Sequence, residues 1–152
     1  MYADTITIFN FYEDKNEDIA WWYPTVLHNV EVQVTKGYNT SKTGNENANS
    51  LYVSIPLRAS NNDLFADGVK YIKPKAFRAN MSKSDTFTLA ETDFIVVGDY
   101  TEFANQFETG YIPDEYYPEG LHQHMKSSYD DVYQIKTVDV FKTIRHIEVG
   151  GI

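Results

Sequence analysis

The chain has 152 residues, which fits one domain, and 42% of them are hydrophobic and 15% aromatic. That content can bury a core and excludes a generically disordered chain. The net charge of −9 argues against wrapping nucleic acid through phosphate neutralisation, and the absence of cysteine excludes disulfides and thiolate zinc sites.

The first half of the chain shows two clear strand patterns. Residues 4–12 alternate, so Ile6, Ile8 and Asn10 face one way and Phe9 the other. Residues 21–34 alternate as well, and we expect one face to carry the following residues: Val26, His28, Val30, Val32 and Val34. On this pattern His28 is a hydrogen-bonded, partly buried histidine, and Leu27 lies on the opposite, solvated face.

The middle of the chain mixes a long polar stretch with further strands. Residues 35–50 lack aliphatic core residues apart from Ala48, which predicts a long loop. Residues 51–58 alternate around Pro56 and predict a strand at an edge or a bulge. Residues 69–77, which are rich in lysine, predict an edge strand.

Strand patterns return in the second half. Residues 93–97 predict a strand that ends in a Gly-Asp turn, and 101–107 a short helix begun by Thr101. Residues 108–131 form a polar insertion rich in Pro, Gly and Tyr. The chain closes on two strands joined near 142–145. Nowhere does the sequence show the pattern of an amphipathic helix of three or more turns.

Short strands separated by turns predict an all-β fold in one domain over residues 1–152. We expect a small antiparallel β-barrel, or a sandwich, with long loops at 35–50 and 108–131 and at most one short helix. A signal-peptide pattern and a run of ~18 apolar residues are both missing, so we expect no membrane contact.

The segment "EGLHQHMK" (119–126) holds the most suggestive pair of side chains, His122 and His124. On a strand both would point to the same side, and one zinc ion could take both. A third ligand would have to come from elsewhere, and no spacing nominates one. We therefore predict no metal site and interpret the pair as the tip of an assembly loop.

Other catalytic patterns are weaker still. Asp114 and Glu115 are adjacent, so on an extended chain they point in opposite directions and make a poor acid–base pair. The sequence has neither a G-x-S-x-G elbow nor a glycine-rich phosphate loop. We predict that the protein is not an enzyme and uses no cofactor. Tyr111, Tyr116 and Tyr117 suit a contact surface, or alternatively a sugar-binding platform.

Charge is segregated along the chain. Five cations from Lys70 to Lys83 follow one another without an acid, whereas residues 84–125 contain nine acids and neither Lys nor Arg. Two interpretations stay open: two solvated faces of a monomer, or a basic edge that meets the acidic edge of the next copy in a ring. The interface candidates are Lys70, Lys73, Lys75, Arg78, Asp114, Glu115, Tyr116 and Tyr117.

Three stretches carry a resemblance to a known family. They are "DTITIFNFYEDKNEDIAWWYPTVLHNVEVQV" at the start, "DFIVVGDY" in the middle and "VYQIKTVDVFKTIRHIEVGGI" at the end. Their order resembles the small head-closure (stopper) type of phage or prophage head–tail connector. The likeness covers the two ends and the middle of the chain, as a pattern of elements without a diagnostic motif.

The resemblance implies a structural virion protein of the phage neck, made in the host bacterial cytoplasm. It implies a ring of copies, a hexamer or a dodecamer, that closes the DNA channel. Portal or adaptor proteins would lie above the ring, and tail-terminator or tail-tube proteins below it. DNA would pass nearby without specific binding.

Two other classes of function stay open. One is a tail terminator or another structural protein associated with the tail tube, which would share the ring-forming composition. The other is a carbohydrate- or metal-binding β-sandwich that uses the tyrosine-rich insertion and His122 and His124.

Overall fold

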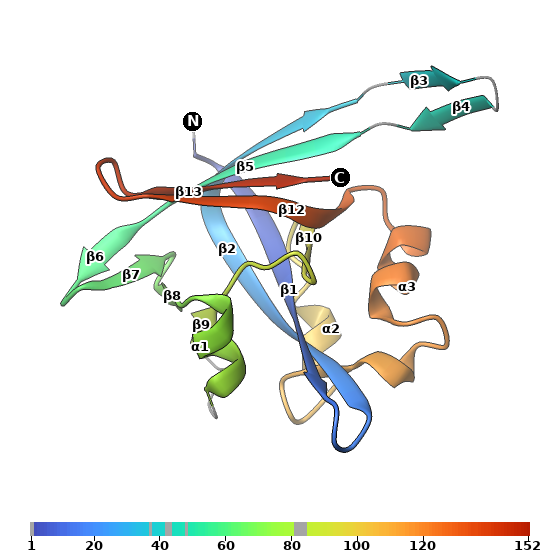
Figure 1. Ribbon diagram of the computed structural model, residues 1–152, viewed down its shortest axis with the longest axis horizontal. Coiled ribbons are helices and arrows are strands. Elements are labelled where there is room, and N and C mark those ends of the chain that lie inside the picture. Colours follow the sequence, from blue (N-terminus) through green and yellow to red (C-terminus); the bar gives the residue numbers. More distant parts are fainter. Residues whose placement is uncertain (1, 37, 42–43, 48, 81–84) are drawn as a thin grey trace.

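In the computed structural model, six antiparallel strands close into a β-barrel (Figure 1). The structure describes residues 2–36, 38–41, 44–47, 49–80 and 85–152. In order around the barrel, the strands are β1 (Asp4–Asp14), β10 (Phe94–Val97), β12 (Val132–Phe141), β13 (His146–Gly151), β5 (Ser50–Pro56) and β2 (Ile19–Thr35). Since β2 pairs with β1 along most of its length, the ring of strands has no open edge there. The predicted all-β barrel is confirmed.

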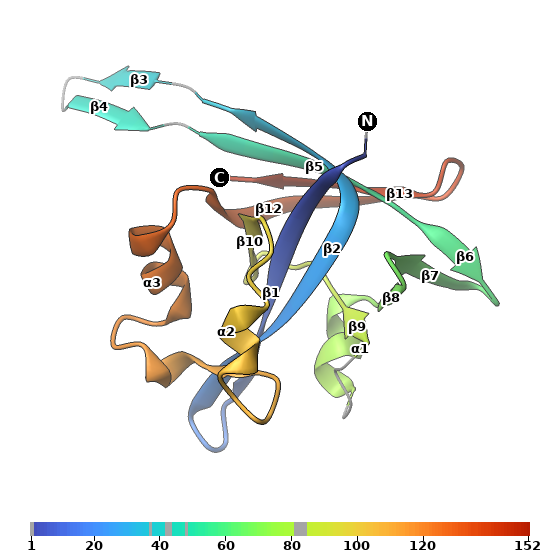
Figure 2. The same cartoon turned by 180° about the vertical axis from the view of Figure 1, so that it is seen from behind.

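The remaining elements decorate this barrel (Figure 2). The additional strands are β3 (Tyr38–Ser41), β4 (Gly44–Asn47), β6 (Arg58–Ser60), β7 (Asp63–Ala66), β8 (Val69–Tyr71), β9 (Thr86–Phe87) and β11 (Ile112–Pro113). The helices are α1 (Pro74–Ala79), α2 (Glu102–Asn105), α3 (Leu121–Ser128) and the 3₁₀ turn η1 (Asp114–Tyr116). Strands β6 to β9 form a separate small sheet, and β11 pairs with β2. The predicted short helix at 101–107 is present as α2.

Strand β1 is buried on both of its faces. Ile6 and Ile8 point into the barrel interior, where they join the main apolar core with Leu27. Phe9 points outward and stacks on Phe94, with ring centroids 4.7 Å apart. The alternation of a strand thus serves two cores at once.

The outer core lies between the barrel wall and the segments that cover it. Its buried members are Phe9, Trp22, Phe94, Val96, Phe103, Ile112, Leu121 and Met125. They come from β1, β2 and β10 below, and from α2, β11 and α3 above (Figures 1 and 2). The aromatic rings allow this thin layer to exclude water, because each buries a large apolar area.

A β-bulge in β2 overturns the predicted facing of that strand. Asp4 pairs with Val30 and Thr5 pairs with His28, so Asn29 is an extra residue, and its φ is 60°. Because one extra residue reverses which side the side chains face, Leu27 is buried whereas His28 is exposed. The predictions that His28 is partly buried and that Leu27 is solvated are therefore wrong.

Two further segments differ from the sequence prediction. The stretch 35–50 was expected to be a loop, yet its described residues include β3 and β4, which pair as an antiparallel ribbon; residues 37, 42, 43 and 48 lie outside the described part. Its polar composition lacks the apolar alternation by which a half-buried strand is recognised. The predicted edge strand at 69–77 ends at Tyr71, and α1 begins at Pro74, because proline suits the first turn of a helix.

The insertion 108–131 also contains more regular structure than a loop. It holds β11, η1 and α3, and these cover the outer core. Buried anchors among polar residues explain this result, since Ile112, Leu121 and Met125 are each 0% exposed.

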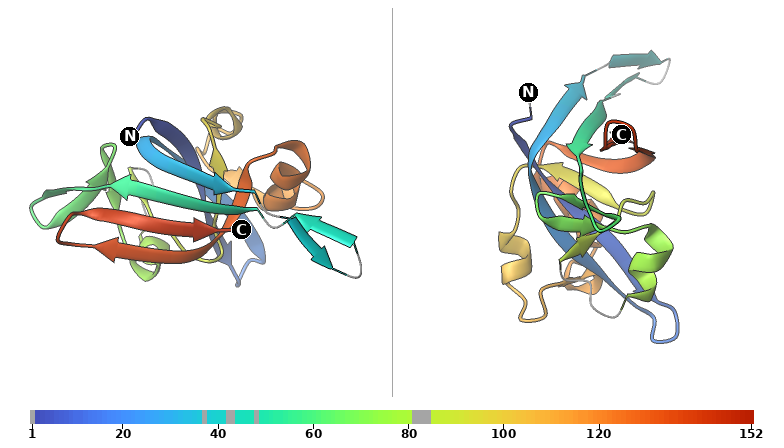
Figure 3. Two further views of the ribbon diagram at one scale, coloured as in Figure 1. Left: turned by 90° about the horizontal axis from the view of Figure 1, so that it is seen from above. Right: turned by 90° about the vertical axis from the view of Figure 1, so that its left-hand side faces the viewer.

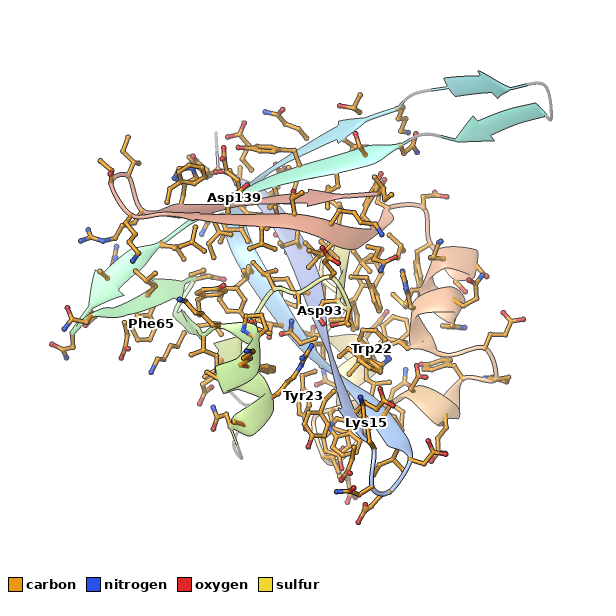
Figure 4. All side chains as sticks on the ribbon, viewed as in Figure 1. Lys15, Trp22, Tyr23, Phe65, Asp93 and Asp139 are labelled. Carbon is orange, nitrogen blue, oxygen red and sulfur yellow. The ribbon has the colours of Figure 1, made fainter. Side chains whose placement is uncertain are left out.

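The buried carboxylate of Asp93 connects β1 with the segment that precedes β10. Asp93 is 1% exposed and accepts hydrogen bonds from the backbone N–H groups of Phe11 (2.8 Å) and Ala90 (3.0 Å). The side-chain amide of Asn10 donates to the same carboxylate at 2.9 Å and to the carbonyl oxygen of Thr88 at 2.7 Å. Burial raises the pKa of Asp93 to about 6, although the hydrogen bonds lower it. The group ties β1 to the segment that enters β10 (Figure 4).

We predict that Asp93→Asn destabilises the fold by about 1–3 kcal/mol at pH 4–5, because the amide NH₂ would face buried N–H donors. The folded-state pKa of about 6 lies above the ordinary value of 3.8, so the native state binds more protons between these values. The stabilising contribution of Asp93 therefore falls as the pH rises from about 4 to about 6 and is level above that, and the cost of the substitution falls with it.

Urea unfolding at pH 4, 5, 6 and 7 measures this cost. Asp139→Asn, at an exposed position of β12, is the matched control. A cost that does not change with pH would contradict the assigned pKa shift.

Candidate functional site

The histidine pair of the sequence lies on a helix. His122 and His124 belong to α3, where residues two apart point about 200° away from each other. The imidazole of His122 stacks on Phe94, with centroids 4.5 Å apart, whereas that of His124 stacks on Tyr117 at 4.3 Å. The prediction that the pair forms the tip of a loop is therefore wrong, and the two side chains do not converge on one ion.

The other histidines do not complete a metal site. In the described part of the chain, no group of three or more His, Asp or Glu residues could hold an ion. His28 is exposed and its Nδ1 lies 3.2 Å from Thr5 Oγ1. His146 stacks on Phe141 and is 3.8 Å from Glu148. Burial, together with Lys126, lowers the pKa of His122, which favours its neutral form.

Asp114 holds the insertion together from inside. Its Oδ1 accepts hydrogen bonds from Trp22 Nε1 and from the backbone N–H of Leu121, both at 2.9 Å. The second bond satisfies an amide at the start of α3, where Gly120 has a φ of 86°. This carboxylate thus joins β2, η1 and α3, and a structural role accounts for its position.

The neighbours of Asp114 face solvent. Glu115 is exposed, and Tyr116 is 60% exposed, the highest value for an aromatic side chain among the described residues. Tyr116 makes edge contacts with Phe107 and Tyr117, whose ring centroids both lie 5.1 Å away. Of the four predicted interface residues in this segment, Glu115 and Tyr116 are therefore the ones that the fold leaves available.

The predicted basic residues lie on a different part of the surface. Lys73, Lys75 and Arg78 are exposed around α1, and none of them has an ion-pair partner among the described residues. Lys70 is paired with Asp63 at 3.4 Å. The fifth cation of this run, Lys83, lies outside the described part.

The fold adds further cations to this group. Arg58 lies on β6, and Lys142 and Arg145 lie in the turn between β12 and β13. The carbonyl oxygen of Arg145 accepts a hydrogen bond from the N–H of Leu57 (3.0 Å), which brings this turn next to β6. We call the following set the basic end: Arg58, Lys70, Lys73, Lys75, Arg78, Lys142 and Arg145.

One group of exposed acids comes from the segment just before α3. In Figure 1, β6 and the β12–β13 turn lie on the left, and α3 with the segment that precedes it lies on the right. We call Glu115 and Glu119, two exposed acids of the segment just before α3, the acidic end. Lys126 is the only Lys or Arg between residues 84 and 135.

Sequence reasoning found one part of each end and missed the rest. Arg58, Lys142 and Arg145 were missed because Arg58 is distant in the chain from the turn that holds the other two. Strand pairing alone brings the two segments together. No local pattern would have revealed them.

The comparisons with known proteins identify a family. The model of a family of unknown function, DUF6751, matches residues 1–152, and the chain belongs to this family. No curated protein and no solved structure matches the chain. None of the helices in the described part is long and apolar enough to cross a membrane.

We predict that Asp114→Ala lowers the free energy of unfolding by about 1–3 kcal/mol, because it leaves Trp22 Nε1 and an amide of α3 without their acceptor. Glu115→Ala, one residue further on, removes an exposed carboxylate and should change stability by less than about 0.5 kcal/mol. Urea unfolding followed by tryptophan fluorescence distinguishes the two variants. Equal costs would contradict the structural role of Asp114.

Proposed function

We propose that this protein is a structural component of a phage neck. Copies form a ring below the portal and adaptor proteins, close the DNA channel and join the head to the tail. The observation that carries the proposal is a closed barrel from which a β-ribbon projects, in a chain whose order of elements resembles the head-closure connectors.

The ribbon is suited to contacts outside its own subunit. Strands β3 and β4 extend the β2–β5 hairpin beyond the barrel (Figure 3). Within the described residues they pair only with each other, so both outer edges are available for further strands. A ribbon of polar sequence whose strands are not among the six of the barrel fits a role in lining the channel or binding a neighbouring copy.

The distribution of charge supports a ring as well. A basic end and an acidic end on opposite sides of one subunit favour head-to-tail contact between identical copies. The net charge of −9 is compatible with DNA that passes without adsorbing. A tail terminator would have the same properties, and it remains the second candidate for the same joint.

The carbohydrate- or metal-binding module receives less support. His122 and His124 stack on separate aromatic rings, and Tyr117 packs against the outer core. These side chains are therefore engaged within the fold.

We predict that replacing residues 38–48 by a Gly/Ser linker of equal length leaves the monomer folded but abolishes ring assembly. The six strands of the barrel all lie outside residues 38–48, so thermal unfolding should be unchanged. Assembly on purified portal–adaptor complexes, followed by electron microscopy, gives the readout. Normal ring assembly by this variant would contradict the proposed role of the ribbon in assembly.

Disruption of the gene in a phage that carries it tests the proposed function itself. We expect DNA-filled or leaking heads beside complete, unattached tails when particles are examined by electron microscopy. Tails of aberrant length would indicate the tail terminator instead. Normal infectious particles would contradict both.

A further inference from the structure

A cleft of about 520 Å³ opens at the basic end of the molecule. Val30, Ile55 and Ala66 lie beneath its floor and are at most 1% exposed, so other residues supply the surface open to a partner. Leu57 and Phe65 form partly exposed walls (Figure 4 shows Phe65 at this end). The apolar surface of Leu57 and Phe65 can contact a hydrophobic or aromatic side chain.

The rim of the cleft carries charges of both signs, from Arg58 and Asp67. Arg58 is exposed at the rim, and the Leu57–Arg145 hydrogen bond brings a second arginine-bearing segment beside it. The rim carboxylate of Asp67 already accepts a hydrogen bond from the backbone N–H of His28 at 2.9 Å. The remaining lysines of the basic end, on β8 and around α1, extend the positive surface.

The acidic end presents the matching features. Tyr116 projects from η1 with 60% of its surface exposed, and the exposed carboxylates of Glu115 and Glu119 flank it. An aromatic side chain between two acids can pair with the apolar surface of Leu57 and Phe65 and with the guanidinium of Arg58. The two surfaces cannot meet within one copy, because they lie at opposite ends of the subunit (Figure 1).

We propose that Tyr116 of one copy inserts into the cleft of the next copy, with Glu115 and Glu119 facing the basic end. The contact is heterologous, because it joins two different surfaces, and repeated copies form a ring where the rotation closes. It rests on the proposed function, since it supplies the head-to-tail step of that ring. Tyr116 is the aromatic anchor of the interface, and the charged rim sets its orientation.

Cross-linking between single-cysteine variants tests this contact, since the natural chain contains no cysteine. Ala59→Cys places a thiol on β6 beside the cleft, and Pro118→Cys places one beside Tyr116; both positions are exposed. The two full-length variants are mixed and treated with a short bismaleimide. The control mixture combines Ala59→Cys with Lys15→Cys, at the exposed turn between β1 and β2.

We expect the test mixture to cross-link about tenfold faster than the control, because docking raises the effective concentration of the two thiols. Adding Tyr116→Ser to the Pro118→Cys variant should reduce the rate to that of the control. Tyr2→Ser, which removes another exposed tyrosine, should leave it unchanged.

Equal rates in the two mixtures, or a fast rate that Tyr116→Ser does not reduce, would overturn the contact. This experiment uses purified protein and does not depend on the particle phenotype. A failed cross-link with a neck defect in disrupted phage rejects only this interface. A specific cross-link together with normal particles rejects only the proposed role in the phage neck.

Discussion

The whole architecture depends on β1, a strand with no solvated face in its central part. Its inward side chains fill the barrel, and its outward phenylalanines hold the layer formed by α2, β11 and α3. Asp93, the residue before β10, accepts hydrogen bonds from Asn10 and Phe11 of the same strand. Because this single strand serves two cores, the covering layer is fixed rigidly to the barrel, and the surface it presents is set by the fold.

The covering layer also determines where several charged side chains lie on the surface. The segment before α3 carries Glu115, Glu119 and Tyr116, whereas β6 and the β12–β13 turn carry Arg58, Lys142 and Arg145 at the far end. The ribbon β3–β4 projects from the barrel between a pair of strands that are themselves firmly held. These surfaces are consistent with the proposed connector, which would contact copies of itself and other proteins of the neck.

The sequence predicts the barrel well because Ile6, Ile8 and the closing hairpin alternate regularly. The predicted facing of β2 is wrong because the extra residue Asn29 reverses the alternation of side chains. As a result His28 is exposed and Leu27 is buried. The sequence prediction also fails where a few buried anchors, such as Leu121 and Met125, fold a polar stretch into a helix and separate the two histidines. Glu115 and Tyr116 were predicted as contact residues and are exposed, but the cleft formed by Phe65, Leu57 and Val30 depends on pairings that no local pattern encodes.

The most direct measurement of the central claim is a cryo-electron microscopy reconstruction of the neck in purified particles of a phage that encodes this chain. The account predicts one closed ring of six-stranded barrels at the head–tail joint, with the β3–β4 ribbons directed toward the channel or a neighbouring copy. A neck whose rings are all built by other proteins, with no density that fits this barrel, would contradict it.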